Sequence, residues 1–407
     1  MMHKPTVPRV CIDLTPNETL DRHGGIGRYG YYLLEQLLQL RAVQAGQVEI
    51  VALPTSTGPV LSGHEALERS VLLQPPIHFG QHRRNRRLFT GPALRRAHVS
   101  LFHALQPVAL PLFAGCRIVC TIHDLIPIVV PRPYPRKWKV GYRRQREKID
   151  WAFRAKRADH LVAISEWTAN DLVTVLDVPR SKITTVHHGV DERIFNADSA
   201  NDAAIVKKYA LPERGFVCVS SDHYRKNHRV LFDAWSSVAP RIPGGLVFVG
   251  HAIYGSTLSD IQDEARKRGL SARFRWLSNV DDRELPAIYR WARATVAPSL
   301  YEGFGMTLIE AMACGSPVIA ARNGVYEEVG GDAVLTFDGA SANDLSERLL
   351  RLSSDDALGA RLRTLGFERA RNFTWRRTAE ATLAVYMRLL CPAHVIEYPV
   401  FEAEQRE

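Results

Sequence analysis

Residues 299–319 read SLYEGFGMTLIEAMACGSPVI, and the short apolar run before them ends near Pro298. The pattern predicts a strand up to this proline, a tight loop at Gly303 and Gly305, and a helix that begins near Met306. A glycine loop that opens onto a helix presents unpaired backbone N–H groups together with the positive end of the helix dipole. Such an arrangement favours the binding of a diphosphate.

Two carboxylates flank this loop. Glu302 precedes it, and Glu310 lies about one turn into the predicted helix. Carboxylate oxygens accept hydrogen bonds from hydroxyl groups, so both residues suit a ribose or a sugar ring, although they also suit an acid–base pair. One glycine pair alone would be typical of an ordinary connection between a strand and a helix, but the whole string favours a binding site.

The same alternation of strand-like and helix-like segments runs along the chain. A glycine group at 24–27 lies between the first apolar run and an amphipathic segment, which is the start of an α/β unit. Short apolar runs that fit buried parallel strands are residues 9–14, 49–53, 117–122, 160–164, 215–220, 245–250, 271–277, 294–298 and 317–321. Segments read as helices are residues 29–40, 228–238, 282–292, 308–314 and 375–390.

A polar segment, 189–204, separates two such alternating series and is interpreted as a linker. We therefore expect an N-terminal Rossmann-like domain at 1–190 and a C-terminal one at 205–374. A helix and tail at 375–407 are expected to return toward the first domain. The predicted fold class is α/β, with two doubly wound domains that face an interdomain cleft. Ligands of such sheets bind beyond the carboxyl ends of the strands.

The composition is that of a soluble globular protein, with 46% apolar and 24% charged residues in 407. No run approaches the roughly 20 apolar residues of a membrane-spanning helix, and the proline-interrupted residues 1–9 do not resemble a secretory signal. The six cysteines form no C-x-x-C pair and lie largely in apolar runs. Reduced core cysteines and a cytoplasmic location are the expectation.

Basic residues are concentrated in the first half of the chain. The net charge is +10, and residues 80–148 contain 15 Lys and Arg against two Asp and Glu. This excess could attract nucleic acid, an anionic membrane face or a phosphate-bearing substrate, and a solvated basic surface is an equal alternative. Charge alone does not choose among them.

The 302–310 segment resembles the Glu-x7-Glu signature of glycosyltransferase family 4, in the GT-B fold superfamily, and the chain looks closest to its mannosyltransferase-like group. Further matching motifs occur in the family's order along nearly the whole chain. They are GGIGRY at 24–29, IHDL at 122–125, AISEWT at 163–168, VHHGVD at 186–191, YRKNH at 224–228 and NGVYEEVGGDA at 323–333.

The resemblance implies a role for each matching position. Glu302 would contact hydroxyls of the transferred sugar, and Glu310 those of the ribose. Lys226 would offset the charge on the leaving phosphate, and His123 would bind the transferred sugar beside the reacting carbon. The catalytic residues implied are His123, Glu302 and Lys226. The implied donor-binding residues are Gly25, Gly27, Ser221, Arg225, Lys226, Glu302, Gly303, Phe304, Gly305, Met306, Thr307, Leu308 and Glu310; the diphosphate would be held by the backbone N–H groups of 305–308.

One position departs from the commonest family pattern. Many members have an arginine five residues before the lysine, where this chain has Ser221. Arg225 would then supply the second positive charge, and the R-K-N variant often accompanies GDP-mannose or related donors in the family. The chain has no D-x-D motif, so we expect no metal and no cofactor beyond the nucleotide sugar, with GDP-linked donors favoured. The adjacent His187 and His188 would point to opposite faces of a strand and could not share a metal.

The resemblance implies a retaining, metal-independent hexosyltransferase, with mannose or a related sugar favoured. The acceptor would be a hydroxyl of a glycan or of a lipid-diphosphate-linked glycan in cell-surface polysaccharide assembly, such as that of lipopolysaccharide. In the superfamily the N-terminal domain receives the acceptor. Its basic and aromatic residues would suit peripheral contact with the inner face of the plasma membrane: Arg83, Arg84, Arg86, Arg87, Arg136, Lys137 and Lys139, with Phe89, Tyr134 and Trp138.

Two alternatives stay open at this point. A GT-B-fold sugar-nucleotide epimerase would have the same fold and cleft but would need no acceptor. A non-catalytic, basic nucleic-acid-binding protein fits the sequence pI of about 9.4, although no base-stacking or groove-reading module is recognisable.

Overall fold

The computed structural model describes residues 7–14, 25–53, 71–72, 83–130, 137–251 and 257–392. The chain forms two compact units. The first consists of residues 1–189 and 375–407, and the second of residues 190–374. Each is an α/β unit built on one parallel sheet, so the prediction of two doubly wound α/β folds is confirmed.

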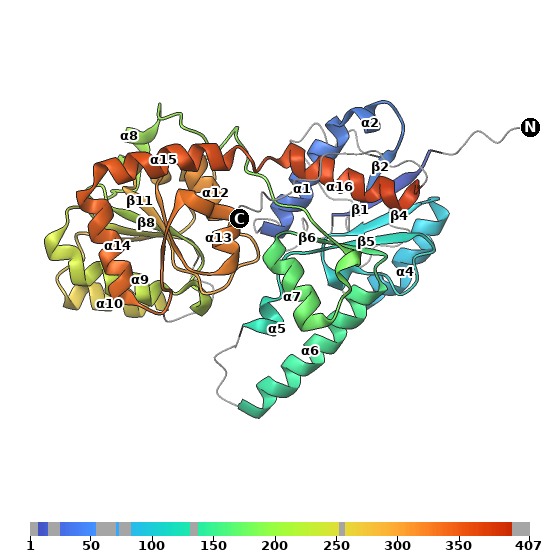
Figure 1. Cartoon of the computed structure of the whole chain (residues 1–407), viewed down its shortest axis with the longest axis horizontal. Helices are drawn as coiled ribbons and strands as arrows, with labels where there is room; N and C mark the ends of the chain where they lie inside the picture. Colours follow the sequence, from blue (N-terminus) through green and yellow to red (C-terminus); the bar gives the residue numbers. More distant parts are fainter. Residues whose placement is uncertain are drawn as a thin grey trace, which may run out of the picture. The chain divides into compact units, whose positions relative to one another are not determined.

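The first unit contains a seven-stranded sheet in the order β3-β2-β1-β4-β5-β6-β7 (Figure 1). Its strands are β1 (Arg9–Asp13), β2 (Glu49–Leu53), β3 (Val71–Leu72), β4 (Leu101–Ala104), β5 (Arg117–Ile122), β6 (His160–Ala163) and β7 (Ile183–Thr185). Its helices are α1 (Gly25–Gln39), α2 (Arg41–Gln44), α4 (Arg83–Arg96), α5 (Ile126–Val129), α6 (Lys137–Arg157), α7 (Glu166–Leu176) and α16 (Trp375–Leu390), with 3-10 turns η3 (Pro107–Ala109) and η4 (Arg180–Lys182).

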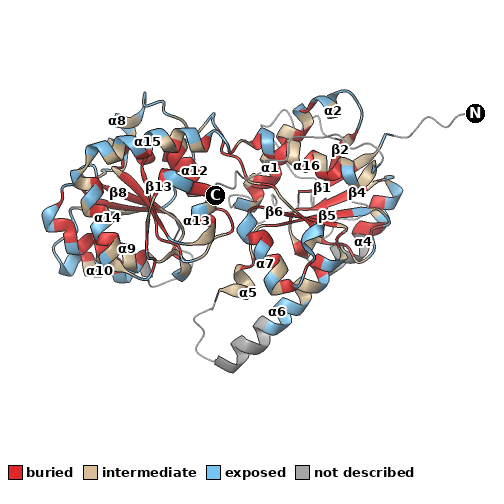
Figure 2. Ribbon diagram, viewed as in Figure 1, coloured by how far each residue is buried: buried red, intermediate tan, exposed pale blue. Residues whose placement is uncertain are grey.

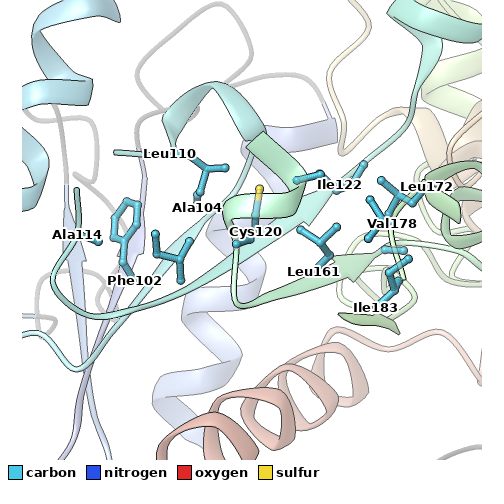
Figure 3. Packing of buried hydrophobic residues seen from close by; sticks show 14 of the residues in the cluster. Phe102, Ala104, Leu110, Ala114, Cys120, Ile122, Leu161, Leu172, Val178 and Ile183 are labelled. Carbon is cyan, nitrogen blue, oxygen red and sulfur yellow. The ribbon is translucent and has the colours of Figure 1, made fainter. Parts of the chain in front are cut away.

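Both faces of this sheet are covered, which explains why its strands are continuous apolar runs. On one face Phe102, Cys120 and Leu161 pack with Leu172 of α7 and Ala155 of α6 (Figure 3). The opposite face lies against α1 and α16, which pack on each other. The strands are therefore the buried centre of the unit, and the helices carry the exposed residues (Figure 2).

The last helix, α16, completes the first unit. Trp375 at its start stacks on Tyr32 of α1, with ring centroids 5.0 Å apart. Thr378 Oγ1 donates a hydrogen bond to the carbonyl of His187 (2.8 Å), and Tyr386 is bonded to His103 of β4 (2.6 Å). Buried polar side chains thus bond this C-terminal helix to elements from the start of the chain.

The second unit contains a six-stranded parallel sheet in the order β10-β9-β8-β11-β12-β13. Its strands are β8 (Phe216–Val219), β9 (Leu246–Val249), β10 (Phe274–Leu277), β11 (Ala294–Ala297), β12 (Val318–Ala321) and β13 (Val334–Phe337). Its helices are α8 (Asp202–Lys208), α9 (His228–Val238), α10 (Thr257–Lys267), α11 (Leu285–Trp291), α12 (Met306–Ala313), α13 (Gly324–Gly330), α14 (Ala342–Ser354) and α15 (Asp356–Ala370), with 3-10 turns η5 (Tyr224–Lys226), η6 (Ala239–Arg241) and η7 (Gly331–Ala333).

Strand order reverses between β8 and β11, because the chain continues from β8 through β9 to β10 on one side and from β11 through β12 to β13 on the other. The loops that leave the carboxyl ends of β8 and β11 diverge at such a switch point and leave a crevice for a ligand. In this unit they are the segments that carry Lys226 and Glu302.

We expected the segment 189–204 to be a linker, and its residues 190–204 lie within the second unit. There the guanidinium of Arg290 binds the carboxylate of Asp202 (2.7 Å) and the carbonyl of Asn196 (2.6 Å). Among the described residues, no helix is long and apolar enough to cross a membrane. All six cysteines are free thiols.

Candidate active site

Two loops meet at the switch point of the second sheet. The loop after β8 leads into η5, and the loop after β11 leads to the glycine pair before α12. The N–H of Leu300 donates to the carbonyl of Arg225 (2.9 Å), and the Arg225 guanidinium donates to the carbonyl of Tyr301 (2.9 Å). These reciprocal bonds hold Arg225 and Lys226 beside Glu302.

Glu302 forms ion pairs with both cations. Its Oε1 lies 2.5 Å from Nζ of Lys226, and its Oε2 lies 2.9 Å from the guanidinium of Arg225. All three side chains are largely buried, with 12–15% of each exposed. Burial alone would raise the pKa of Glu302, but Lys226 and Arg225 outweigh it and lower that pKa to about 2. Glu302 is therefore ionised at neutral pH, and the site has one negative and two positive charges.

Two asparagines fix these loops. Asn227 has a left-handed backbone (φ 57°), and its side-chain amide donates to the carbonyls of Pro298 (3.2 Å) and Gly339 (2.8 Å). Asn323 donates to the carbonyl of Ser299 (2.8 Å), while its Oδ1 accepts from the N–H of Tyr326 and caps α13. Sequence reasoning assigned no role to either residue, although both lie in the family motifs quoted above.

Gly305 begins the helix α12. Its φ of 98° and ψ of 49° lie in the left-handed region, and a Cβ placed there would be 2.9 Å from Cε1 of Tyr326. Only glycine fits this turn without strain. The N–H of Leu308 donates to the Gly305 carbonyl (2.9 Å), so this predicted diphosphate donor is already used within the first turn. The N–H groups of Met306 and Thr307 belong to the first turn of α12, whose N–H groups have no partner within the helix.

Glu310 differs from Glu302 in its surroundings. Its side chain is buried, and the hydroxyl of Tyr289 donates to Oε2 (3.1 Å). Glu302 therefore belongs to the charged cluster at the switch point. Glu310 lies one turn into α12, where it contacts Tyr289 of α11. Tyr289 was not predicted, since nothing in its local sequence marks it as a partner of a residue 21 positions later.

The other predicted donor-binding residues of the second unit, Ser221, Gly303 and Phe304, lie in the two loops that carry Glu302, Lys226 and Arg225. Ser221 lies two residues after the end of β8, and its carbonyl accepts the N–H of His223 (2.9 Å). Gly303 and Phe304 are buried, and the Phe304 ring contacts that of Phe373 edge to face. The cationic charge next to Glu302 therefore comes from η5, not from the Ser221 position.

His123 lies in the first unit, just after the carboxyl end of β5. Its Nε2 is 3.0 Å from the carbonyl of Leu105, which requires the ring proton on Nε2 and makes Nδ1 an acceptor in the neutral ring. Burial lowers the pKa of His123 to about 4, and the bond to Leu105 only partly opposes this effect. His123 is therefore neutral at pH 7. Asp124 beside it accepts a hydrogen bond from the N–H of Ile126 (2.9 Å) and so stabilises the turn that leads into α5.

Aromatic rings enclose His123. The Tyr29 ring meets it edge on at 5.1 Å and stacks on His188 at 4.9 Å, and His188 also meets His123 edge on at 5.5 Å. The Tyr29 hydroxyl is 3.1 Å from Oγ1 of Thr121, which is bonded to His103 (2.8 Å). Sequence reasoning overlooked Tyr29 and considered His188 only as a metal ligand.

Gly25 and Gly27 lie in the first turn of α1. Gly25 is exposed, and a Cβ added to it would have no atom within 4 Å, whereas Gly27 is buried. Gly24 and the rest of the loop after β1 lie outside the described residues. Within the described part of the chain, no group of three or more His, Cys, Asp and Glu side chains is placed to hold a metal ion. The interdomain cleft remains a prediction.

Comparisons with known proteins agree with this architecture. Residues 23–193 match the family model described as Glycosyltransferase Family 4, and residues 203–369 match the one described as Glycosyl transferases group 1. O-antigen chain mannosyltransferase B of Escherichia coli is 27% identical over 276 residues, which are 66% of this chain and 70% of that protein. A D-inositol 3-phosphate glycosyltransferase of Salinispora tropica is 33% identical over 296 residues, 67% of this chain and 59% of that protein.

A solved structure supports the fold independently. The crystal structure of a glycosyltransferase from Rickettsia africae matches with a TM-score of 0.73 over 95% of this chain and 99% of the other, at 16% identity. The family models match both halves of the chain in order, and each half contains a doubly wound parallel sheet. The chain therefore belongs to the family 4 glycosyltransferases of the GT-B fold and is a glycosyltransferase.

Proposed function

We propose that this enzyme transfers mannose, or a closely related hexose, from a nucleoside diphosphate sugar to a hydroxyl of a glycan or lipid-linked acceptor, with retention of configuration. A GDP-linked donor is favoured. The observation that carries the proposal is the cluster of Glu302 with Lys226 and Arg225 at the switch point of the second sheet. The similarity to an O-antigen chain mannosyltransferase supports mannose and a role in cell-surface polysaccharide assembly.

The donor diphosphate would bind between the two cations and the open end of α12. Lys226 and Arg225 provide two positive charges there, and the N–H groups of Met306 and Thr307 provide donors along the helix dipole. This set can neutralise a diphosphate by itself, so we propose a metal-independent reaction without a cofactor. Charge that develops on the leaving phosphate is stabilised by the same groups.

Glu302 would bind the transferred sugar and not attack it. A carboxylate whose pKa is about 2 stays ionised but is a weak base and a weak nucleophile. Its oxygens can still accept hydrogen bonds from sugar hydroxyls once the diphosphate draws the cations toward itself. Glu310 is buried against Tyr289, so it would contribute to the ribose site only through a carboxylate oxygen that faces the nucleotide.

The chemical step we propose occurs on one face of the sugar. The bond from the anomeric carbon to the phosphate oxygen breaks as the acceptor oxygen approaches from the same side and forms the new bond. The acceptor's proton passes to the departing phosphate oxygen, so no protein base is required. Neutral His123 would hold the sugar through Nδ1, which accepts a hydrogen bond from a hydroxyl.

We also propose that the reaction takes place in the cytoplasm at the inner face of the plasma membrane, where a lipid-diphosphate-linked acceptor would lie. The basic and aromatic residues first selected for this contact have side chains outside the described residues, from Arg83 to Phe89 and from Tyr134 to Lys139. An epimerase would use the same donor without any acceptor, so a product assay separates it from a transferase.

A binding screen followed by product analysis tests the proposal. Melting curves should be measured with GDP, UDP and ADP and with their hexose derivatives, since a ligand that binds only the folded state raises the melting temperature. We expect GDP and GDP-mannose to give the largest increase. Anomeric coupling constants in the NMR spectrum of the glycoside should then show retention. If no nucleoside diphosphate raises the melting temperature, the proposal is wrong.

A further inference from the structure

Three large apolar side chains of the first unit are unusually exposed. Phe113 is 75% exposed, Ile149 61% and Phe153 57%. Among the described residues they are the most exposed of the large apolar side chains. Exposed apolar groups are unremarkable when scattered, but a group of them marks a surface that meets another apolar phase.

These three side chains form one surface, which we call the α6 patch. Ile149 and Phe153 are four residues apart on α6 and lie on the same side of the helix. One turn further, the Arg157 guanidinium lies 5.5 Å from the centroid of the Phe153 ring. The same guanidinium donates to the carbonyls of Pro111 (2.9 Å) and Leu112, the two residues before Phe113. Arg157 therefore joins the α6 patch into a continuous area.

The opposite side of α6 anchors the helix to the unit. Ala155 is buried in the core beneath the sheet, and Trp151 packs against the same core. Arg154 is buried too, where it donates to the carbonyl of Pro107 (3.3 Å) and binds the carboxylate of Asp150 (2.7 Å). The α6 patch is thus presented on a fixed helix, with exposed residues along its outer side (Figure 2).

The charge around the α6 patch is positive. The helix contains nine Lys and Arg residues and two acidic ones, and of the acidic ones Asp150 is already paired with Arg154. Arg146, Lys148 and Lys156 are exposed. Basic residues beside exposed aromatic and aliphatic side chains are the arrangement by which helices lie in the interface of an anionic bilayer.

We propose that the α6 patch docks this enzyme on an anionic lipid bilayer. Phe113, Ile149 and Phe153 enter the boundary between headgroups and acyl chains, while Arg146 and Lys148 bind lipid phosphates. A bilayer fits better than a protein partner, because three side chains are far smaller than the roughly 1,000 Å² of a specific protein interface. The proposal rests on the proposed use of a lipid-linked acceptor, and it assigns the contact to residues other than those between 83–89 and 134–139 that the sequence first indicated.

Vesicle co-sedimentation of the full chain tests this assignment. Wild-type enzyme is expected to pellet with vesicles of phosphatidylcholine and phosphatidylglycerol, and to stay in solution with phosphatidylcholine alone. Phe113→Ser and Phe153→Ser should each weaken binding about tenfold, the effect of withdrawing one aromatic side chain from an apolar phase. Arg146→Glu and Lys148→Glu should each weaken it about fivefold or more. Leu300→Ser, which alters a 52% exposed side chain of the second unit, is the matched control and should bind like wild type.

Three results would overturn the proposal. The first is equal pelleting of the wild type with both vesicle types. The second is undiminished vesicle binding by the double variant of Phe113 and Phe153. The third is a wild-type dimer in sedimentation velocity that this double variant converts to a monomer. The last would assign the α6 patch to a second copy of the chain. The increase in melting temperature with GDP-mannose is measured on the same samples. Its absence in wild type would refute the proposed donor, whereas its retention in a variant that has lost vesicle binding shows that the variant is folded.

Discussion

Replacing Glu302 by glutamine should destabilise the free enzyme and strengthen its response to a diphosphate. The substitution keeps the shape of the side chain but removes the charge that lies between Lys226 and Arg225. The two cations lower the pKa of Glu302 from 4.5 to about 2, which corresponds to about 3 kcal/mol of stability at neutral pH. Removing one partner of a buried ion pair costs a similar amount, about 3–5 kcal/mol of stability. For a unit of this size, the melting temperature should fall by roughly 6–12 °C.

Melting curves with and without GDP measure the effect. In wild type the diphosphate has to share the cations with Glu302, whereas in the glutamine variant it provides the missing negative charge. The increase in melting temperature with GDP should therefore be larger in Glu302→Gln than in wild type, although turnover falls. Glu380→Gln is the control, because it removes a carboxylate from an exposed ion pair with Arg376 and should change stability by less than about 1 kcal/mol. A Glu302→Gln enzyme with wild-type melting and wild-type GDP response would refute this reasoning.

The ion pairs of Glu302 with Lys226 and Arg225 also make the stability of the enzyme depend on pH. Since the folded-state pKa of Glu302 is depressed, its contribution is fully present above pH 4.5 and is lost as the pH falls from 4.5 to about 2. Lys226→Ala should lower donor affinity and reduce turnover by about 100-fold or more; calorimetry with GDP checks it, and unchanged affinity would contradict the assignment. Gly305→Ala should cost roughly 1–3 kcal/mol in urea unfolding and weaken GDP binding, because the added Cβ meets Tyr326 in a left-handed turn; wild-type unfolding would count against it. Tyr29→Phe should lose about 1 kcal/mol with the bond to Thr121 but keep kcat, whereas Tyr29→Leu should lower kcat by releasing His123; equal kcat in both variants would show that the ring does not position the histidine.

The elements that the sequence predicts best are those whose apolar runs are long enough to show. The strand near Pro298 and the loop before Met306 occur as expected in β11 and α12. Strand β4 was not predicted, because its four residues, Leu101–Ala104, include a buried histidine. His103 is tolerated there because both Thr121 and Tyr386 bond to it, and Tyr386 lies 283 residues away, a contact that no local pattern reveals.

In the candidate site, too, the local sequence predicts some features and only the fold determines the others. The glycine loop stands out because the left-handed backbone at Gly305 demands glycine there, and the two glutamates stand out because they flank that loop. The different surroundings of Glu302 and Glu310 arise from partners 76 and 21 residues away, Lys226 and Tyr289, which only the fold brings close. The absence of an arginine at Ser221 looked like a gap in the cationic site. The structure shows that Arg225 reaches Glu302 directly.

The position of α16 has a consequence for how the chain is made. The first unit is not a continuous stretch, since its last helix is synthesised after the whole second unit. Until Tyr386 leaves the ribosome, His103 in the middle of the first sheet lacks one of its two bonding partners, and Tyr32 lacks the ring of Trp375. The second unit is the continuous stretch 190–374, so it has no element that is synthesised later than the first unit's last helix. We therefore expect the second unit to complete its folding before the first, and a nascent chain that stops before α16 to leave the apolar face of α1 exposed to chaperones.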